Sequence, residues 1–113
     1  GWRGFVAGVI GEAAAALGAP EVALRAHMGP SIGPCCFEVG PEVAERFDGT
    51  VVVSGSRPRV DLRAAARAAL VAAGAMLVTD EQPPCTRCDP RGLPSYRRHG
   101  PGTPHLVHWI AVA

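Results

Sequence analysis

Four cysteines are the residues of this chain best suited to chemistry. Cys35 and Cys36 are adjacent, while Cys85 and Cys88 form a C-x-x-C pair. Such a pair can bind zinc or form a redox disulfide, but a structural zinc site normally uses two spaced pairs, and adjacent cysteines do not easily point at one ion. We expect no signal peptide, and therefore no oxidising compartment in which disulfides would form. We therefore expect Cys85 and Cys88 to be free thiols in buried or half-buried positions.

The adjacent cysteines also allow a second hypothesis, a thiol nucleophile. They end a loop, residues 29–36, that contains two Gly and two Pro and is therefore rigid. A hydrolase would pair Cys35 or Cys36 with a histidine base. The candidate bases are His27, His99, His105 and His108. The sequence does not show which of them approaches the loop, so a Cys-dependent hydrolase stays an alternative.

Two segments that contain arginine are suited to binding an anion. Arg3 lies in a Gly-Trp-Arg-Gly turn that leads into a predicted helix, where unpaired N–H groups and a guanidinium can hold a phosphate. Residues 95–98, with the sequence SYRR, place two guanidiniums beside a phenol, which suits an anion next to a flat ring. Spacing alone favours a simpler interpretation of the second segment, in which its arginines are exposed and solvated.

Composition limits the classes of protein to consider. The chain has 113 residues, of which 48% are apolar and 19% charged, with a formal net charge of +1. This length allows one domain, and so high an apolar content with so little net charge excludes a disordered chain. The net charge provides no general field for nucleic acid or an anionic membrane, and no apolar run reaches the ~20 residues of a membrane span. We expect a single domain over residues 1–113.

Hydrophobic periodicity predicts alternating helices and strands. Helices are expected over residues 5–17, 41–48 and 61–73, and strands over 22–28, 51–53, 76–78 and 106–112. This order predicts an α/β layered domain with helices packed on a mixed β-sheet. The last strand is almost continuously apolar, so we expect it to be central and covered on both faces.

The helix expected over 61–73 has the clearest local signals. Asp61 is a good N-cap, and Gly74 is suited to end the helix. The apolar positions, among them Leu62 and Leu70, fall on one face. Arg63 and Arg67 are therefore expected to face solvent.

Five segments, in this order, resemble the laccase-domain family of purine nucleoside phosphorylases, also called the polyphenol oxidase or multi-copper polyphenol oxidase family. They are GWRG at 1–4, GPSIGPCCFEVG at 29–40, DLRAAAR at 61–67, CTRC at 85–88 and SYRR at 95–98. Any one of them arises easily by chance, but all five in the family's order make a strong resemblance. The chain is similar to the C-terminal part of a larger laccase-type domain.

The resemblance implies a cytoplasmic enzyme that cleaves adenosine, inosine or methylthioadenosine with phosphate and also deaminates adenosine. Purine nucleoside and phosphate are then its partners, with no nucleic acid and no membrane. The family's metal is a zinc ion bound by two histidines and a cysteine, while copper belongs to an oxidase activity also attributed to the family. In the family pattern these ligands precede Gly1. We therefore expect no metal ligand in this chain, and we expect the isolated fragment to be inactive.

The same resemblance assigns the substrate- and phosphate-binding residues to Arg3, Tyr96, Arg97 and Arg98. Cys35 and Cys36 would shape a pocket loop, and no catalytic group is assigned. The chain departs from the family at residues 92–94, where aromatic side chains are common, and at 102–104, where an expected Arg is missing. The alternative outside the enzymes is a non-catalytic binding or scaffold fragment.

Overall fold

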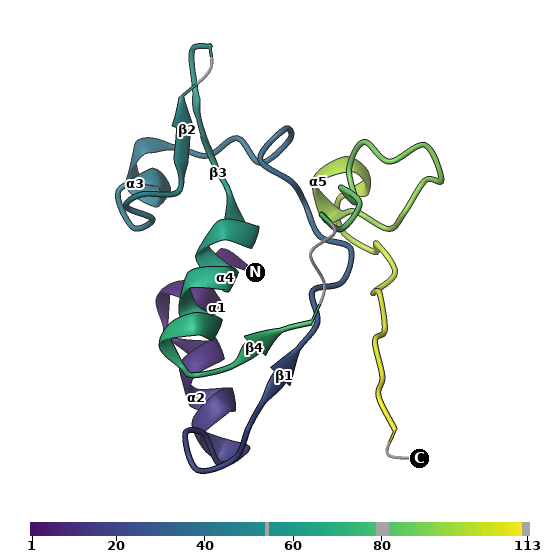
Figure 1. Ribbon diagram of the computed structural model, residues 1–113. Helices are drawn as coiled ribbons and strands as arrows, with labels where there is room; N and C mark the ends of the chain where they lie inside the picture. Colours follow the sequence, from purple (N-terminus) through teal and green to yellow (C-terminus); the bar gives the residue numbers. More distant parts are fainter. Residues whose placement is uncertain (54, 79–81, 112–113) are drawn as a thin grey trace.

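The computed structural model describes residues 1–53, 55–78 and 82–111 (Figure 1). Short helices and strands alternate along them. In chain order the elements are α1 (Trp2–Val6), α2 (Val9–Ala16), β1 (Arg25–Ala26), α3 (Pro41–Ala44), β2 (Val51–Val53), β3 (Pro58–Val60), α4 (Leu62–Ala72), β4 (Met76–Leu77) and α5 (Tyr96–His99). In these ranges, no helix has the length and apolar character needed to cross a membrane.

The strands form two small sheets. β1 and β4 pair in parallel, with Arg25 opposite Met76. β2 and β3 form an antiparallel hairpin, with Val51 opposite Val60. Parallel neighbours require a long crossover connection, and α4 lies within the one that joins β1 to β4. The predicted α/β class is confirmed, but in the described residues the parallel and antiparallel pairs form two separate sheets and not the expected single mixed sheet.

The hydrophobic core lies where α3 meets the β2–β3 hairpin (Figure 1). Val60 of β3 is completely buried. Around it are the buried side chains of Phe37, Val39, Val43, Ala44 and Phe47. The edge of this cluster is covered by partly buried side chains that include Trp2, Phe5, Ile32 and Leu62. Apolar packing therefore joins α1 and the start of α4 to the hairpin.

The helix expected over 5–17 is divided into α1 and α2 at Gly8. Gly8 has a φ of 82°, a conformation that glycine adopts without the strain a side chain would bring. Its N–H bonds to the carbonyl oxygen of Phe5, which closes the last turn of α1. Ala14 is the buried residue of α2, whereas Val9 and Leu17 are exposed. The spacing of apolar residues predicts the helical segment but not the break within it.

The prediction for α4 is confirmed at its ends and wrong on one of its faces. The Asp61 carboxylate accepts hydrogen bonds from the backbone N–H groups of Arg63 and Ala64, each at 3.0 Å, and Gly74 follows the helix with a φ of 77°. Arg63 does not face solvent, because its side chain is only 9% exposed. Arg67 is half-buried. The reason for the burial of Arg63 is a set of hydrogen bonds to a distant loop.

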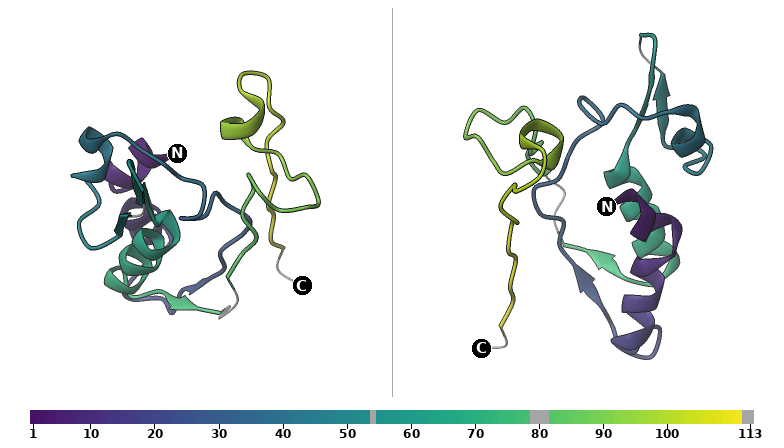
Figure 2. Two further views of the ribbon diagram at one scale, coloured as in Figure 1. Left: turned by 90° about the horizontal axis from the view of Figure 1, so that it is seen from above. Right: turned by 180° about the vertical axis from the view of Figure 1, so that it is seen from behind.

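The expected central strand over 106–112 is also wrong. Residues 106–111 run as an extended tail with no assigned strand (Figure 2), and residue 112 lies outside the described residues. Trp109 is 85% exposed and Ile110 90% exposed. An apolar run becomes a central strand only where other strands flank it and layers cover both faces, and the described residues do not provide them. β1 is also shorter than the strand expected over 22–28, and neither β3 nor α5 was expected.

Candidate functional site

The structure brings all four cysteines of the chain into one group, here called the Cys cluster. Their Sγ atoms all lie within 4.8 Å of one another. The Sγ atoms of Cys35 and Cys88 are 3.7 Å apart. Cys36 is buried, Cys85 is half-buried, and the other two are exposed. The expectation that adjacent cysteines cannot easily point at one ion is therefore wrong here, and the cluster could hold a metal ion.

A backbone bridge aligns the two segments that carry the cysteines. The N–H of Ser31 donates to the carbonyl oxygen of Pro84 at 3.3 Å, and the N–H of Thr86 donates to the carbonyl oxygen of Ser31 at 3.1 Å. These bonds make a parallel bridge between Ser31 and Cys85. The N–H of Gly33 donates to Cys85 Sγ at 3.2 Å. The convergence of the four thiols thus rests on main-chain geometry and not only on side-chain rotamers.

The surroundings of the thiols give them different acidities. Cys35 is exposed as a residue, but the atoms packed around its sulfur reduce its solvation and so raise its pKa, and hydrogen bonds with the other three cysteines bring the pKa to about 12. Burial also opposes ionisation of Cys85. However, hydrogen bonds from the backbone N–H groups of Gly33, Cys88 and Arg87 outweigh burial and lower the pKa of Cys85 to about 6. These contacts favour the thiolate form at Cys85 and the thiol form at Cys35.

Arg63 reaches from α4 to the loop that carries Cys35. Its Nε donates to Ser31 Oγ at 3.1 Å, and its Nη2 donates to the carbonyl oxygen of Ser31 at 2.8 Å. Nη1 lies 3.5 Å from Gln82 Oε1. A Cβ at Gly33 would lie 3.2 Å from Cys35 Sγ and 3.4 Å from Arg63 Nη2, so thiol and guanidinium flank the same glycine. Arg63 therefore fixes the loop and places a positive charge beside the Cys cluster.

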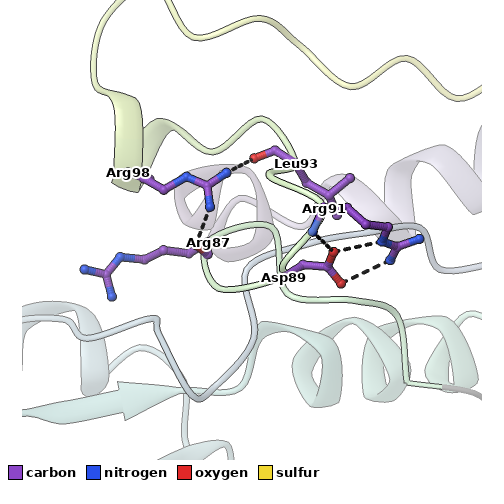
Figure 3. Close-up of polar contacts among 5 residues, drawn as sticks. All are labelled: Arg87, Asp89, Arg91, Leu93 and Arg98. Atoms are coloured by element: carbon purple, nitrogen blue, oxygen red, sulfur yellow. Dashed lines mark hydrogen bonds and ion pairs between the residues drawn. The ribbon is translucent and has the colours of Figure 1, made fainter.

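The segment after Cys85 is held by two arginines (Figure 3). Arg98 of α5 donates hydrogen bonds from its guanidinium to the carbonyl oxygens of Arg87 and Leu93. Arg91 forms an ion pair with Asp89, with 2.8 Å between Nε and Oδ1. The hydrogen bond from Arg91 lowers the pKa of the Asp89 carboxyl. The loop between residues 85 and 93 is thus shaped by polar contacts.

A separate pocket of about 290 Å³ lies between the beginning of the chain and α5. Trp2, Phe37 and Tyr96 line it with aromatic side chains, and Arg97 adds a positive charge. The Arg97 guanidinium carbon lies 5.1 Å from the centroid of the Phe37 ring, and its Nη1 donates to the carbonyl oxygen of Glu38 at 2.7 Å. Residues from distant parts of the sequence therefore provide flat apolar surfaces beside one fixed cation.

The full chain, residues 1–113, matches the family described as multi-copper polyphenol oxidoreductase laccase. The chain belongs to this family. The resemblance inferred from its five motifs is thereby confirmed. Among the curated laccase-family relatives, a protein named adenosine deaminase RL5, from an unknown prokaryotic organism, is 41% identical over 114 residues. A purine nucleoside phosphorylase of Xylella fastidiosa strain 9a5c is 39% identical over 107 residues.

The laccase-family relatives are longer than the present chain. The matches cover 88% and 87% of this chain but only 43% and 41% of the two relatives. A solved structure from Neisseria meningitidis superimposes with a TM-score of 0.72 at 32% identity, covering 88% of this chain and 44% of the other. The chain thus spans less than half the length of these relatives.

The residues that laccase-family motifs predict as site residues fall into two groups. Tyr96 and Arg97 line the pocket, and Arg3 lies next to it, with its guanidinium carbon 5.1 Å from the ring centroid of Trp2. Arg98 instead points its donors at main-chain carbonyls. Contact of any of these residues with substrate stays a prediction.

Two features of this laccase-family chain were not found from the sequence. Cys35 and Cys36, expected to shape a pocket loop, contribute to the Cys cluster and are not in the lining of the aromatic pocket. The role of Arg63 was missed because helical spacing alone places it outward; the one available signal was its position in the DLRAAAR motif. Within the described residues, no hydrogen bond joins a histidine to a cysteine, so the geometry does not favour the thiol hydrolase.

Proposed function

We propose that this chain forms the C-terminal part of a purine nucleoside phosphorylase with adenosine deaminase activity, located in the cytoplasm. Its substrates would be phosphate and adenosine, inosine or methylthioadenosine. Two relatives, one named as an adenosine deaminase and one as a purine nucleoside phosphorylase, support this activity class. The single observation that carries the proposal for this chain is the pocket in which Trp2, Phe37 and Tyr96 meet Arg97.

The pocket chemistry matches a nucleoside and phosphate. Aromatic faces stack on flat heterocycles such as a purine, and a guanidinium binds phosphate oxygens in pairs. Arg97 uses one donor for the carbonyl oxygen of Glu38, which fixes the side chain and leaves other N–H groups for an anion. In phosphorolysis, phosphate attacks the ribose C1′ as the purine leaves. Arg97 would orient the phosphate and offset its charge, with Arg3 as a second cation nearby.

The family resemblance implies a zinc ion bound by two histidines and a cysteine. The described part of this chain does not bring such a combination of side chains together. Its metal-capable group consists of four cysteines and includes no histidine. We therefore propose that the ligands of the zinc used in deamination, or of copper in an oxidase activity, lie outside these 113 residues. The contribution of this chain would be substrate binding.

The experiment is an assay of phosphate-dependent release of hypoxanthine from inosine by a full-length protein that contains this segment. Arg97→Ala is expected to lower kcat/KM at least tenfold, because it removes the cation fixed in the pocket. Arg91→Ala is the matched control, since it removes an exposed arginine outside the pocket lining. Thermal unfolding of both variants then checks that each remains folded.

The alternatives give different outcomes in the same assay. Equal phosphorolysis by Arg97→Ala and the unmodified protein would remove Arg97 from the site. Nucleoside binding without turnover in any phosphate concentration would support the binding or scaffold fragment. Product release that needs no phosphate and disappears in Cys35→Ser would support the thiol hydrolase.

A further inference from the structure

We propose that Cys35, Cys36, Cys85 and Cys88 bind one Zn²⁺ ion in a tetrahedral, all-thiolate structural site. The ion would fasten the C-terminal segment, residues 82–111, to the loop at residues 29–36. This site is separate from the proposed nucleoside pocket and does not depend on the proposed activity.

The distances among the sulfurs are close to those of a tetrahedral zinc site. With Zn–S bonds of about 2.3 Å, the sulfurs of a regular tetrahedron are about 3.8 Å apart. Cys35 Sγ and Cys88 Sγ are 3.7 Å apart, and all four Sγ atoms lie within 4.8 Å of one another. Closing the widest of these separations to the tetrahedral distance requires a shift of about 1 Å at most, which small rotations of the side chains provide.

Main-chain contacts hold the two segments that carry the thiols. The bridge between Ser31 and Cys85 fixes the relative position of the two ligand-bearing segments. The Gly33 N–H donates a hydrogen bond to Cys85 Sγ at 3.2 Å. Hydrogen bonds of this kind orient metal ligands and stabilise the negative charge on sulfur. The cluster thus has both ligands and the outer contacts that normally support them.

The C-terminal segment needs such a link, because it contributes little to the hydrophobic core. The core cluster and the partly buried side chains around it come from residues 2–65 within the described part of the chain. The segment from 82 to 111 is instead attached by polar contacts such as that between Arg97 and the Glu38 carbonyl oxygen. A zinc ion that joins Cys35 to Cys88, 53 positions apart, would close a long loop and stabilise the attachment.

The charge balance of the proposed site also fits its surroundings. Each cysteine that is still protonated gives its proton to solvent as zinc binds, and no oxidant or reductant is required. Four thiolates and Zn²⁺ carry a net charge of −2. The guanidinium of Arg63, across Gly33 from Cys35, would offset part of this charge.

A disulfide between Cys35 and Cys88 is the competing explanation of their proximity. It would require the two sulfurs to move from 3.7 Å to about 2.0 Å and would need an oxidant. It would also leave Cys36 and Cys85 with no role in the cluster. Zinc uses all four sulfurs, so the geometry favours the metal.

The test is a metal analysis of the full chain purified with reductant, followed by titration with Co²⁺ as a spectroscopic probe. We expect Co²⁺ to give the visible bands of a tetrahedral tetrathiolate site and Zn²⁺ to displace it. Cys88→Ser is expected to lower Co²⁺ affinity at least tenfold and to remove one zinc equivalent per chain relative to the unmodified protein. Cys88 is exposed, so this change leaves the core intact. Arg91→Ala, on the same loop, is the control and should retain both metal content and spectrum.

Three results would overturn the proposal. These are equal zinc content in the Cys88→Ser variant and the unmodified protein, an octahedral Co²⁺ spectrum, and bound iron in place of zinc. A Cys35–Cys88 disulfide in protein purified without reductant, combined with no Co²⁺ binding after reduction, would support the competing explanation. Cadmium NMR of the unmodified protein reports the number of sulfur ligands directly, so the proposal is tested even if a cysteine variant fails to fold.

Discussion

Arg98 Nη1 donates a hydrogen bond to the main-chain carbonyl oxygen of Arg87 at 2.8 Å (Figure 3). Arg87 lies between Cys85 and Cys88, so α5 directly supports the turn that carries two of the four thiols. The neighbouring Arg97 points instead to the Glu38 carbonyl oxygen beside the aromatic pocket. The SYRR motif therefore has one arginine that holds the cysteine turn and one that lines the pocket.

Replacement of Arg98 by Ala is predicted to loosen this turn. The variant loses hydrogen bonds from a charged donor to the carbonyl oxygens of Arg87 and Leu93. We expect the free energy of unfolding to fall by about 1 kcal/mol, since part of each bond is replaced by water. Urea denaturation measures the loss, and hydrogen exchange should show faster exchange of the amides in residues 85–88.

Arg91→Ala is the control variant for Arg98→Ala. Arg91 pairs with Asp89 on the surface of the same loop, and among the described residues its guanidinium hydrogen-bonds only to that carboxylate. Exposed ion pairs contribute little to stability, so the urea midpoint should not change. An equal loss of stability in both variants would show that Arg98 has no special role in holding the turn.

Replacement of Arg63 by Ala is predicted to cost about 2 kcal/mol in the free energy of unfolding. The change removes the donors to the Ser31 hydroxyl and carbonyl oxygens and leaves these groups without their partner in a half-buried position. Arg63→Lys keeps the charge but not the planar fork and should recover only part of the loss. Chemical denaturation of both variants measures the difference.

Arg67→Ala tests whether the effect belongs to Arg63 or to any arginine of α4. Arg67 lies one turn further along and is half-buried. It makes no hydrogen bond to the described residues. We expect a change within about 0.5 kcal/mol. If Arg67→Ala lowered the free energy of unfolding as much as Arg63→Ala, the hydrogen bonds to Ser31 would not explain the effect of Arg63.

The elements that were predicted correctly are those with local signals. Asp61 and Gly74 mark the ends of α4 through capping chemistry that involves only nearby residues, and helical spacing identifies its length. The same spacing placed Arg63 outward because its partner, Ser31, is 32 positions away and makes no local pattern. The burial of a polar residue depends on long-range partners, which one sequence does not reveal.

The Cys cluster and the C-terminal tail were missed for related reasons. The convergence of Cys35 with Cys88 depends on the main-chain bridge between Ser31 and Cys85, which spacing within either cysteine pair does not indicate. The apolar run at 106–111 has the composition of a central strand, but composition says nothing about what lies beside it. Sequence patterns specify a tendency to be buried, whereas burial itself requires a covering surface.

Substitution of Gly33 by Ala is predicted to weaken metal binding at the Cys cluster. A Cβ at this position would lie 3.2 Å from Cys35 Sγ, which is tighter than most Cβ contacts, and 3.4 Å from Arg63 Nη2, at the edge of ordinary contact. Cys35 Sγ would have to shift by a few tenths of an ångström, which displaces one thiol of the cluster next to the hydrogen bond from the Gly33 N–H to Cys85 Sγ. We expect a loss of Co²⁺ affinity of roughly tenfold, as for other contacts that orient metal ligands.

Gly11→Ala is the matched control, because the same substitution is made far from the Cys cluster at a position with room for a side chain. A Cβ at Gly11 meets no atom within 4 Å, and the residue lies inside α2 with helical neighbours on both sides. Alanine in a helix interior is more favourable than glycine by about 0.8–1 kcal/mol, so the thermal midpoint should rise while Co²⁺ affinity stays unchanged. If Gly33→Ala bound Co²⁺ as tightly as Gly11→Ala, the close approach of Gly33 to Cys35 and Arg63 would have no part in shaping the cluster.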